Sequence, residues 1–450
     1  MKRQLVATLL VLLALPAFAA SAPGAGIAAL LTHADAGLGL ARPELVRRMA
    51  HRSRARRRRL LSSRETEAGA DRPVRAGLGA GGGGSIVTNE YLVHLSVGTP
   101  PRPVALTLDT GSDLVWTQCA PCLDCFDQGV PLLDPARSST YAALPCDAPL
   151  CRALPFTSCG GGGGSWGERS CVYVYHYGDK SLTVGQLAAD RFTFGNADGR
   201  SERRLTFGCG HFNKGIFQAN ETGIAGFGRG RWSLPSQLGV TSFSYCFTSM
   251  FESKSSLVTL GAAAELRSGA AFQSTPLLKD PSQPSLYFLS LKGISVGSKR
   301  LPVPERRLRS TIIDSGASIT TLPEDVYEAV KAEFVAQVGL PVIGAEAGAA
   351  LDLCFALPAT APFWGRRGRR AVAVPSLTLH LDGADWELPR GNYVFEDHGA
   401  RVMCLVLDAA AGEQTVIGNY QQQNTHVVYD LHRDLLSFAP AQCDKLGASL

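Results

Sequence analysis

Leu106-Thr107-Leu108-Asp109-Thr110-Gly111-Ser112 and Thr311-Ile312-Ile313-Asp314-Ser315-Gly316-Ala317 are the two stretches of the sequence that decide the fold. In each, a short aliphatic or β-branched run leads an Asp directly into a turn made by a hydroxyl residue and a Gly. The run predicts a buried strand, and the Gly lets the backbone bend sharply and approach a neighbouring segment. A carboxylate at the end of a buried strand is costly unless it is hydrogen-bonded or paired. Because each half of the chain carries one such strand, we expect the two carboxylates to be partners.

The surroundings of the two stretches are also alike. Tyr91–Gly98 precedes the first stretch, and the similar segment Tyr287–Gly297 precedes the second. Downstream, Ile224-Ala225-Gly226 has its counterpart in Val416-Ile417-Gly418. The sequence therefore predicts an internal duplication, in which each half contains a strand, an Asp turn and a distant apolar strand that ends in Gly.

The N-terminus has the pattern of a secretory signal peptide over residues 1–19. Lys2 and Arg3 precede an apolar run, and Ala17-Phe18-Ala19 fits a small-x-small cleavage site. The run is too short to span a bilayer comfortably, and no later stretch is long enough, so we expect no membrane anchor. Behind a secretory signal, the 12 cysteines predict disulfides instead of a zinc site or a redox dithiol.

Residues 20–84 are rich in Arg and end in a Gly-rich linker, Gly79–Ser85. We interpret this region as a basic propeptide that shields an acidic enzyme until processing, and we expect a basic helix over Arg42–Leu61. A run such as Arg54–Arg59 can also mark nucleic-acid binding. We do not expect that function, because the run precedes the folded domain and would be removed.

The remaining chain has the composition of an all-β protein. Among 450 residues, 48 are Gly and 18% are charged, which suits many turns and no dominant helix. We place an N-terminal lobe at 85–245 and a C-terminal lobe at 246–450. Pro323–Val338 is the clearest predicted helix, and Val172–Tyr177 predicts one strand of a β-hairpin. The segment Cys119–Cys171 is polar and Gly-rich, so we expect it to stay outside the core.

Four motifs together resemble those of the pepsin-like aspartic proteases, in particular the plant nepenthesin-type branch. The motifs are residues 109–116, 177–179, 314–316 and 417–424, and the resemblance covers roughly residues 88 to 445. It implies a bilobal fold of two β-barrel-like lobes related by a pseudo-twofold axis, with a few short helices. It also implies a cleft between the lobes that takes an extended polypeptide substrate.

The resemblance assigns roles to residues of these motifs. Asp109 and Asp314 would be the catalytic pair, supported by Thr110, Gly111, Ser112, Ser315 and Gly316. A flap over the cleft would carry the substrate-facing Tyr177 with Gly178 and Asp179, and Trp116 would lie beside it. At the position of Ala317 the family usually has Thr or Ser. Because a hydrogen-bond donor to a carboxylate favours its charged form, we expect a less acidic pH optimum than is usual for the family.

Spacing alone does not determine the disulfide pairing, but the resemblance implies one. The implied pairs are Cys119–Cys122, Cys125–Cys209, Cys146–Cys171, Cys151–Cys159, Cys246–Cys443 and Cys354–Cys404. Asn220-Glu221-Thr222 is the only N-glycosylation sequon, so we expect a glycan at Asn220.

The sequence favours a secreted aspartic endopeptidase that is made as a zymogen. Two facing carboxylates that share one proton can activate a water molecule without a cofactor or a metal ion. We expect a monomer that is sensitive to pepstatin-like inhibitors and resides outside the cell or in the cell wall, or alternatively in the vacuole. The alternative function is an inactive binding protein on the same fold, resembling the xylanase-inhibitor proteins.

Overall fold

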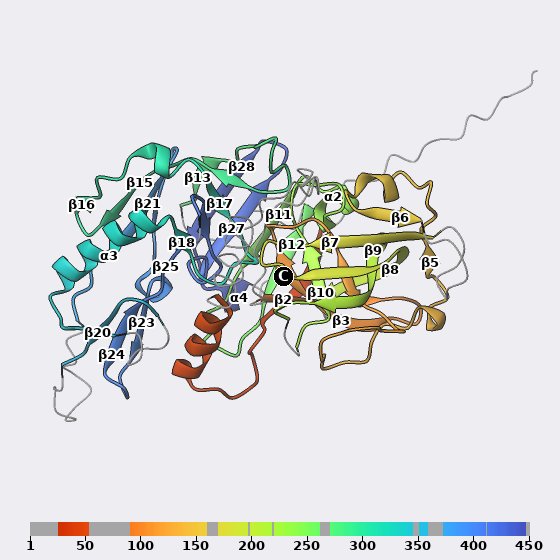
Figure 1. The fold of residues 1–450 in the computed structure, drawn as a ribbon, viewed down its shortest axis with the longest axis horizontal. Helices are drawn as coiled ribbons and strands as arrows, with labels where there is room; N and C mark the ends of the chain where they lie inside the picture. The colour runs from red at the N-terminus through yellow and green to blue at the C-terminus, as the bar shows by residue number, and fades with distance from the viewer. Residues whose placement is uncertain are drawn as a thin grey trace, which may run out of the picture.

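The structure is a computed structural model and describes residues 26–53, 91–159, 170–196, 199–217, 220–261, 271–344, 351–358, 372–410 and 412–446. The predicted signal peptide, the run Arg54–Arg59 and the linker Gly79–Ser85 lie outside these residues. Strands dominate, as expected, and form two β-rich halves that lie side by side (Figure 1). No helix among the described residues is long and apolar enough to cross a membrane.

One large sheet runs through both halves and joins them. Its strands follow the spatial order β13-β28-β27-β11-β12-β1-β2-β3-β10-β4-β9-β8-β7-β6, and β5 pairs with β8 at its side. The bounds are β13 (Gln273–Pro276), β28 (Leu435–Pro440), β27 (Thr425–Asp430), β11 (Ser242–Cys246), β12 (Ser256–Leu260), β1 (Ile27–His33), β2 (Tyr91–Val97), β3 (Arg102–Asp109), β10 (Gly223–Gly226), β4 (Trp116–Gln118), β9 (Gly199–Lys214), β8 (Leu182–Asn196), β7 (Cys171–His176), β6 (Thr157–Cys159) and β5 (Ala142–Ala143).

Three smaller sheets complete the C-terminal half, and short helices connect the strands. The sheets are β14-β17-β26-β18-β25, β16-β15-β21-β22 and β19-β20-β24-β23. Their bounds are β14 (Phe288–Leu289), β17 (Thr311–Ile313), β26 (Thr415–Ile417), β18 (Thr321–Leu322), β25 (Asp408–Ala409), β16 (Lys299–Arg300), β15 (Leu291–Val296), β21 (Leu377–Leu381), β22 (Ala384–Glu387), β19 (Val342–Ile343), β20 (Cys354–Ala356), β24 (Val402–Leu405) and β23 (Val394–Asp397). The α-helices after residue 90 are α2 (Leu234–Leu238), α3 (Glu324–Val338) and α4 (Cys443–Leu446), and single 3-10 turns lie at Pro135–Arg137, Cys151–Ala153, Glu305–Arg307 and Arg390–Asn392.

The internal duplication is confirmed by the strand pairing. In the first half, β3 pairs in parallel with β10, so that Asp109 lies opposite Gly226. In the second half, β17 pairs in parallel with β26, so that Ile313, next to Asp314, lies opposite Ile417. In both halves the Gly-ending strand also pairs, antiparallel, with the strand that follows the Asp turn, β4 or β18. The same strand topology therefore places each Asp at the end of its strand.

The predicted propeptide region contains a strand that the sequence analysis did not anticipate. β1 lies in the middle of the large sheet, between β12 and β2. Its buried residues Ile27, Ala29 and Leu31 alternate with more exposed ones, which is the period of a strand with one face in the core. The stretch was missed because it is short and lies between the apolar signal run and the basic segment.

The predicted helix Pro323–Val338 is confirmed, and the predicted helix Arg42–Leu61 is helical over its described residues. Residues 42–53 form a helix whose Leu45, Val46 and Met49 are buried (red in Figure 1). α3 follows Pro323, ends before Gly339 in the left-handed region at φ +64°, and buries Val326, Val330 and Phe334. A positive φ suits Gly at a helix end because Gly has no Cβ.

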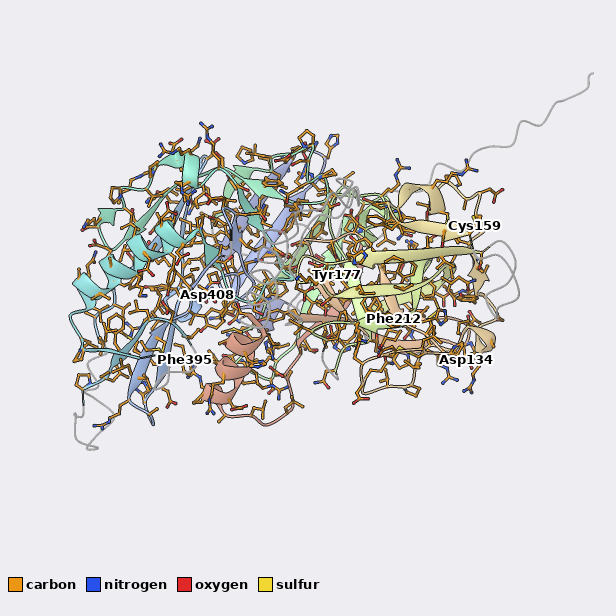
Figure 2. The ribbon with its side chains drawn as sticks, in the orientation of Figure 1. Asp134, Cys159, Tyr177, Phe212, Phe395 and Asp408 are labelled. Carbon is orange, nitrogen blue, oxygen red and sulfur yellow. A yellow bond between two sulfur atoms is a disulfide. The ribbon has the colours of Figure 1, made fainter. Side chains whose placement is uncertain are left out.

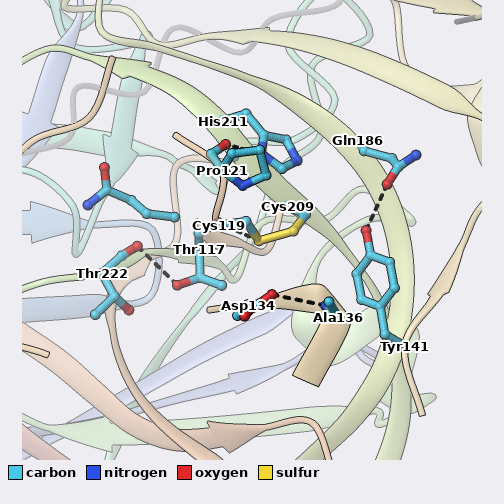
Figure 3. Close-up of a disulfide and its surroundings, with 12 residues drawn as sticks. Thr117, Cys119, Pro121, Asp134, Ala136, Tyr141, Gln186, Cys209, His211 and Thr222 are labelled. Atoms are coloured by element: carbon cyan, nitrogen blue, oxygen red, sulfur yellow. Dashed lines mark hydrogen bonds between the residues drawn. A yellow bond between two sulfur atoms is a disulfide. The ribbon is translucent and has the colours of Figure 1, made fainter. Parts of the chain in front are cut away.

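All 12 cysteines form disulfides, but four of the implied pairings are wrong. Cys246–Cys443 and Cys354–Cys404 are confirmed. Cys119 pairs with Cys209 (Figure 3), not with Cys122. Cys122 pairs with Cys125. The reason is the parallel pairing of β4 with β9, which sets Thr117 opposite Cys209 and brings the Cα atoms of Cys119 and Cys209 to 5.3 Å.

The other two implied pairs are also exchanged. Cys151 pairs with Cys171, and Cys146 pairs with Cys159. Cys151 and Cys171 are both buried in one apolar cluster of the N-terminal half, whereas Cys159 is exposed at the end of β6. The two disulfides therefore differ in burial, because one joins two buried cysteines and the other includes an exposed cysteine. The expectation that Cys119–Cys171 stays outside the core is wrong for Cys119, Cys151 and Cys171, since each is at most 3% exposed.

Candidate active site

The two Asp turns meet at the junction of the halves through reciprocal hydrogen bonds. The backbone N–H of Thr110 donates to Oγ of Ser315 at 3.0 Å, and the backbone N–H of Ser315 donates to Oγ1 of Thr110 at 2.9 Å. The Ser315 hydroxyl then donates to the carbonyl oxygen of Leu108 at 2.9 Å. Each hydroxyl satisfies a buried N–H of the opposite turn, so the two turns lock each other in place.

The two carboxyl groups lie close together within this lock. Asp109 and Asp314 are both 0% exposed. The N–H of Gly111 donates to Oδ1 of Asp109 at 3.0 Å, and the N–H of Gly316 donates to Oδ1 of Asp314 at 2.8 Å. A Cβ at Gly316 would lie 2.3 Å from Oδ1 of Asp109 and 3.2 Å from Oδ1 of Asp314. The carboxyls therefore flank Gly316, and only Gly fits between them.

The outer sides of the two carboxyls differ. The Ser112 hydroxyl donates to Oδ2 of Asp109. The equivalent position beside Asp314 is Ala317, which is buried and packs in an apolar cluster with Phe288 and Val416. Ala317 has no side-chain donor, so the asymmetry expected from the sequence is present in the local packing.

Tyr177 lies at the end of the β7–β8 hairpin, near the middle of the molecule (Figure 2). Its hydroxyl accepts a hydrogen bond of 2.7 Å from the indole Nε1–H of Trp116. Burial raises the pKa of Tyr177 well above its ordinary value, and the neighbouring Tyr175 and Asp109 add to this effect. The Tyr177 phenol therefore stays protonated, and Trp116 fixes its position.

The hairpin turn is stabilised by its own residues. Asp179 is 0% exposed, and its carboxylate accepts hydrogen bonds of 2.8 Å from both the backbone N–H and the hydroxyl of Ser181. Asp179 thus supports the turn that follows Gly178. Lys180 adopts φ +66°, a left-handed conformation that costs a residue with a Cβ more than Gly.

Several buried side-chain amides of the motif at residues 417–424 support the second Asp turn, a role that was not predicted from the sequence. Asn419 Nδ2 donates to the Ser315 carbonyl at 3.0 Å, and Gln422 Nε2 donates to the Ile417 carbonyl at 2.8 Å. The Tyr245 hydroxyl donates to Oε1 of Gln422 at 2.5 Å. A run of amides after a buried strand could have indicated this support, because buried amides need hydrogen-bond partners.

Sequence reasoning missed Asp113, a further and partly buried carboxyl close to the site. Its carboxylate accepts from the backbone N–H of Gly230 at 2.8 Å and from the hydroxyl of Ser285 in the other half. Its own N–H donates to the Tyr175 hydroxyl at 3.2 Å. Burial raises the pKa of Asp113, and the bonds from Ser285 and Gly230 partly oppose this rise. Asp113 therefore connects the first Asp turn to both the hairpin and the second half.

The sequon residue Asn220 lies away from this site, on the exposed surface. Its Nδ2 donates to the carbonyl oxygen of Ala34 at 2.7 Å. Thr222, the hydroxyl residue of the sequon, is buried and bonded to Ala105. Asn220 therefore connects the body to the segment that follows β1.

Two sequence families match most of the chain. The family described as "Xylanase inhibitor N-terminal" matches residues 91–262, and "Xylanase inhibitor C-terminal" matches residues 286–440. The chain is 38% identical over 433 residues to aspartic proteinase nepenthesin-1 of Nepenthes gracilis, covering 94% of this chain and 91% of that protein. It is 34% identical over 481 residues to aspartyl protease 37 of Oryza sativa subsp. japonica, covering 98% and 99%.

Solved structures share the fold at lower identity. The crystal structure of basic 7S globulin from soybean superposes with a TM-score of 0.62 at 20% identity, covering 81% of this chain and 96% of that chain. The crystal structure titled edgp gives a TM-score of 0.60 at 22% identity, covering 79% and 92%. At this identity the two structures establish the architecture alone.

Proposed function

The chain belongs to the pepsin-like aspartic protease family, in its plant nepenthesin-type branch, and from this premise we propose that it is a secreted aspartic endopeptidase made as a zymogen. Asp109 and Asp314 are the proposed catalytic pair. The observation that carries the proposal is the pair of reciprocal bonds between Thr110 and Ser315, which holds the two buried carboxyls on either side of Gly316.

The proposed reaction is general acid/base hydrolysis of a peptide bond. Two carboxyls this close share one proton, a behaviour for which the aspartic proteases are the general example. The ionised carboxylate takes a proton from a water molecule as its oxygen attacks the peptide carbonyl carbon, while the other carboxyl protonates the carbonyl oxygen. The tetrahedral intermediate then collapses, its C–N bond breaks, and the leaving nitrogen receives a proton. The pair titrates as a unit, so neither Asp is assigned as base or acid alone.

The zymogen proposal rests on the segment before residue 54. Its β1 occupies the centre of the sheet that joins the halves. Its helix over residues 42–53 buries Leu45 and Met49 in a cluster with Ile319 and Tyr420 of the C-terminal half. On its other side a hollow of about 540 Å³ separates the helix from Ile216 and Phe217 of the N-terminal half. A segment that contacts both halves at their junction would restrict the entry of a polypeptide.

We further propose the compartment and partners expected from the sequence. The N-terminal pattern and six disulfides favour the secretory route, with the cell exterior or cell wall as the destination and the vacuole as the alternative. The substrate would be an extended polypeptide, and a pepstatin-like inhibitor would compete for the same site. The protein would act as a monomer.

Incubating the purified precursor with denatured protein over a graded acid pH series tests the proposal. We expect shortening of the precursor and cleavage of the added protein, and both should be abolished by pepstatin. Asp109→Asn and Asp314→Asn should each be inactive while keeping the wild-type melting temperature to within a few degrees. Cleavage that survives either substitution would overturn the assignment of the catalytic pair.

The second candidate is a non-enzymatic binding protein on the same fold. It is favoured by the descriptions of the matching families as xylanase inhibitors and by Ala317 in place of a hydroxyl residue. It predicts that the processed protein cuts no peptide under any acid condition and instead inhibits a xylanase in a direct assay. The protease is supported by the presence of both carboxyls and by the equivalent bonds that they accept from the N–H groups of Gly111 and Gly316.

A further inference from the structure

The cysteine-rich segment Cys119–Cys171 places an aromatic ring beside the β7–β8 hairpin. Phe126 directly follows the Cys122–Cys125 disulfide. Its ring stacks on that of Phe217 with centroids 4.6 Å apart and meets Trp116 edge-on at 6.4 Å. Phe217 also meets Trp116 edge-on, at 5.5 Å. Because Trp116 holds the Tyr177 hydroxyl, the three rings form one continuous wall with the hairpin tyrosine.

Two of the three rings in this wall remain partly exposed to solvent. Phe126 and Phe217 are only partly buried at the edge of the cluster that contains Trp116 and Tyr177. Phe217 and Ile216 line the hollow of about 540 Å³, whose opposite side consists of Glu44, Arg47, Arg48, His51 and Arg52 of the proposed propeptide. Removal of the propeptide helix would open the hollow on the side of Phe217, the ring on which Phe126 stacks.

Two independent sets of contacts hold Phe126 at this position. The buried carboxamide of Gln118, which lies two residues after Trp116 in β4, binds the Phe126 backbone on both sides. Its Nε2 donates to the Phe126 carbonyl at 2.9 Å, and its Oε1 accepts from the Phe126 N–H at 3.2 Å. The Cys122–Cys125 disulfide closes the preceding loop, and Asn213 Nδ2 donates to the Cys125 sulfur at 3.3 Å.

We propose that Phe126 is a specificity-determining residue, and that together with Phe217 it forms an apolar subsite for a large aromatic or aliphatic side chain of the peptide substrate. The Cys122–Cys125 disulfide and Gln118 are positioning elements for its ring. This inference rests on the proposed protease function and deepens it. It gives the cysteine-rich segment a role in substrate selection, because the Cys122–Cys125 disulfide positions the Phe126 side chain.

The test uses the processed enzyme and two matched peptide series, in which each position on either side of the cut carries Phe in one series and Ala in the other. The wild type should prefer Phe over Ala, measured as the ratio of kcat/KM, at one or more positions. Phe126→Ala should lower this ratio at one position about three- to tenfold, the range expected for the loss of an aromatic contact. Phe126→Leu should give an intermediate ratio. If Phe126→Ala does not fold, Phe126→Leu provides the test instead.

Two controls separate the subsite from general loosening of the segment. Leu123 lies in the same disulfide loop and is 74% exposed, so Leu123→Ala should keep the wild-type ratio. The paired change Cys122→Ser with Cys125→Ser should lower the same ratio as Phe126→Ala does. The paired change Cys146→Ser with Cys159→Ser removes a disulfide elsewhere in the segment and should not lower it.

The two levels of the proposal fail differently. If the processed wild type cuts no peptide of either series, the protease function fails and this inference falls with it. If the wild type is selective and folded Phe126 variants keep its ratio at every position, the subsite alone is overturned. An unchanged ratio in the Cys122 and Cys125 double variant overturns the role of that disulfide.

Discussion

The hydroxyl of Ser285, in the C-terminal half, donates a hydrogen bond to the partly buried carboxylate of Asp113, which lies four residues after Asp109 in the N-terminal half. The same junction is closed by the backbone, because the N–H of Arg229 donates to the Ser285 carbonyl at 3.0 Å. A titratable group thus takes part in the contact between the halves, close to the proposed catalytic pair.

This arrangement predicts a pH-dependent contribution of Asp113 to stability. Burial raises the pKa of Asp113 above that of the unfolded chain. Between those two pKa values the folded state binds more protons, so the free energy of unfolding falls as pH rises through that window. Asp113→Asn removes this penalty, so the melting temperature of the variant should rise relative to that of the wild type as the pH increases above the ordinary Asp pKa of about 3.9. The exposed Asp127→Asn is the control, and a pH-independent difference for Asp113→Asn would contradict the prediction.

The lock between the turns predicts a large effect of a single hydroxyl. Ser315→Ala leaves the buried N–H of Thr110 without its acceptor and the Leu108 carbonyl without its donor. A buried polar group without a partner costs about 1–3 kcal/mol. We expect a loss of that size in the free energy of unfolding, measured by urea denaturation, together with reduced activity. Ser139→Ala, at an exposed hydroxyl, should change neither. Wild-type stability in Ser315→Ala would show that the reciprocal bonds contribute little.

The environment of Asp314 predicts a shift in the pH profile. Ala317→Thr would add a hydroxyl that can donate to the outer oxygen of Asp314, as Ser112 does for Asp109. Because such a bond favours the charged carboxylate, the pH optimum should become more acidic. Ala317 is 3% exposed, so Ala317→Ser provides a smaller variant should Thr prove too large. An unchanged or higher optimum in both variants would count against the assigned role of position 317.

The fold could be predicted from the sequence wherever a local pattern and its repeat agreed. The run before Asp109 was predicted as a buried strand and forms the end of β3, because its successive aliphatic and β-branched residues favour a strand that is buried on both faces. The helix after Pro323 was equally clear, since Val326, Val330 and Phe334 recur at helical spacing. Both Asp turns repeated one motif, which is why their meeting could be expected.

What could not be predicted depends on contacts distant in sequence. The pairing of Cys119 with Cys209 follows from the parallel neighbours β4 and β9, which no spacing of cysteines reveals. Asp113 could be taken for an ordinary turn residue until Ser285 and Gly230 are placed around its carboxylate. The insertion of β1 into the sheet depends on the free edges of β2 and β12, which are distant in the chain.

The segment before residue 54 carries a buried ion-pair cluster that predicts how firmly its helix is held. Asp35, which follows β1, contacts Arg48 at 3.2 Å and Arg52 at 3.1 Å on the helix, and its side chain is 1% exposed. Removing one partner of a buried pair costs about 3–5 kcal/mol, because the remaining charge is left uncompensated. Asp35→Asn should therefore loosen the helix and expose its arginines to added trypsin.

Measuring this in an Asp109→Asn background separates opening of the segment from self-cleavage. The rate of trypsin cleavage within residues 42–53 should rise at least tenfold in Asp35→Asn. Glu44→Gln is the matched control, because Glu44 and Arg47 form a surface pair on the same helix, with side chains 42% and 59% exposed. Such pairs contribute about 0–1 kcal/mol, so this variant should be cut at nearly the original rate. Equal rates in the two variants would mean that the Asp35 cluster does not hold the helix against the body, and that its apolar face alone does so.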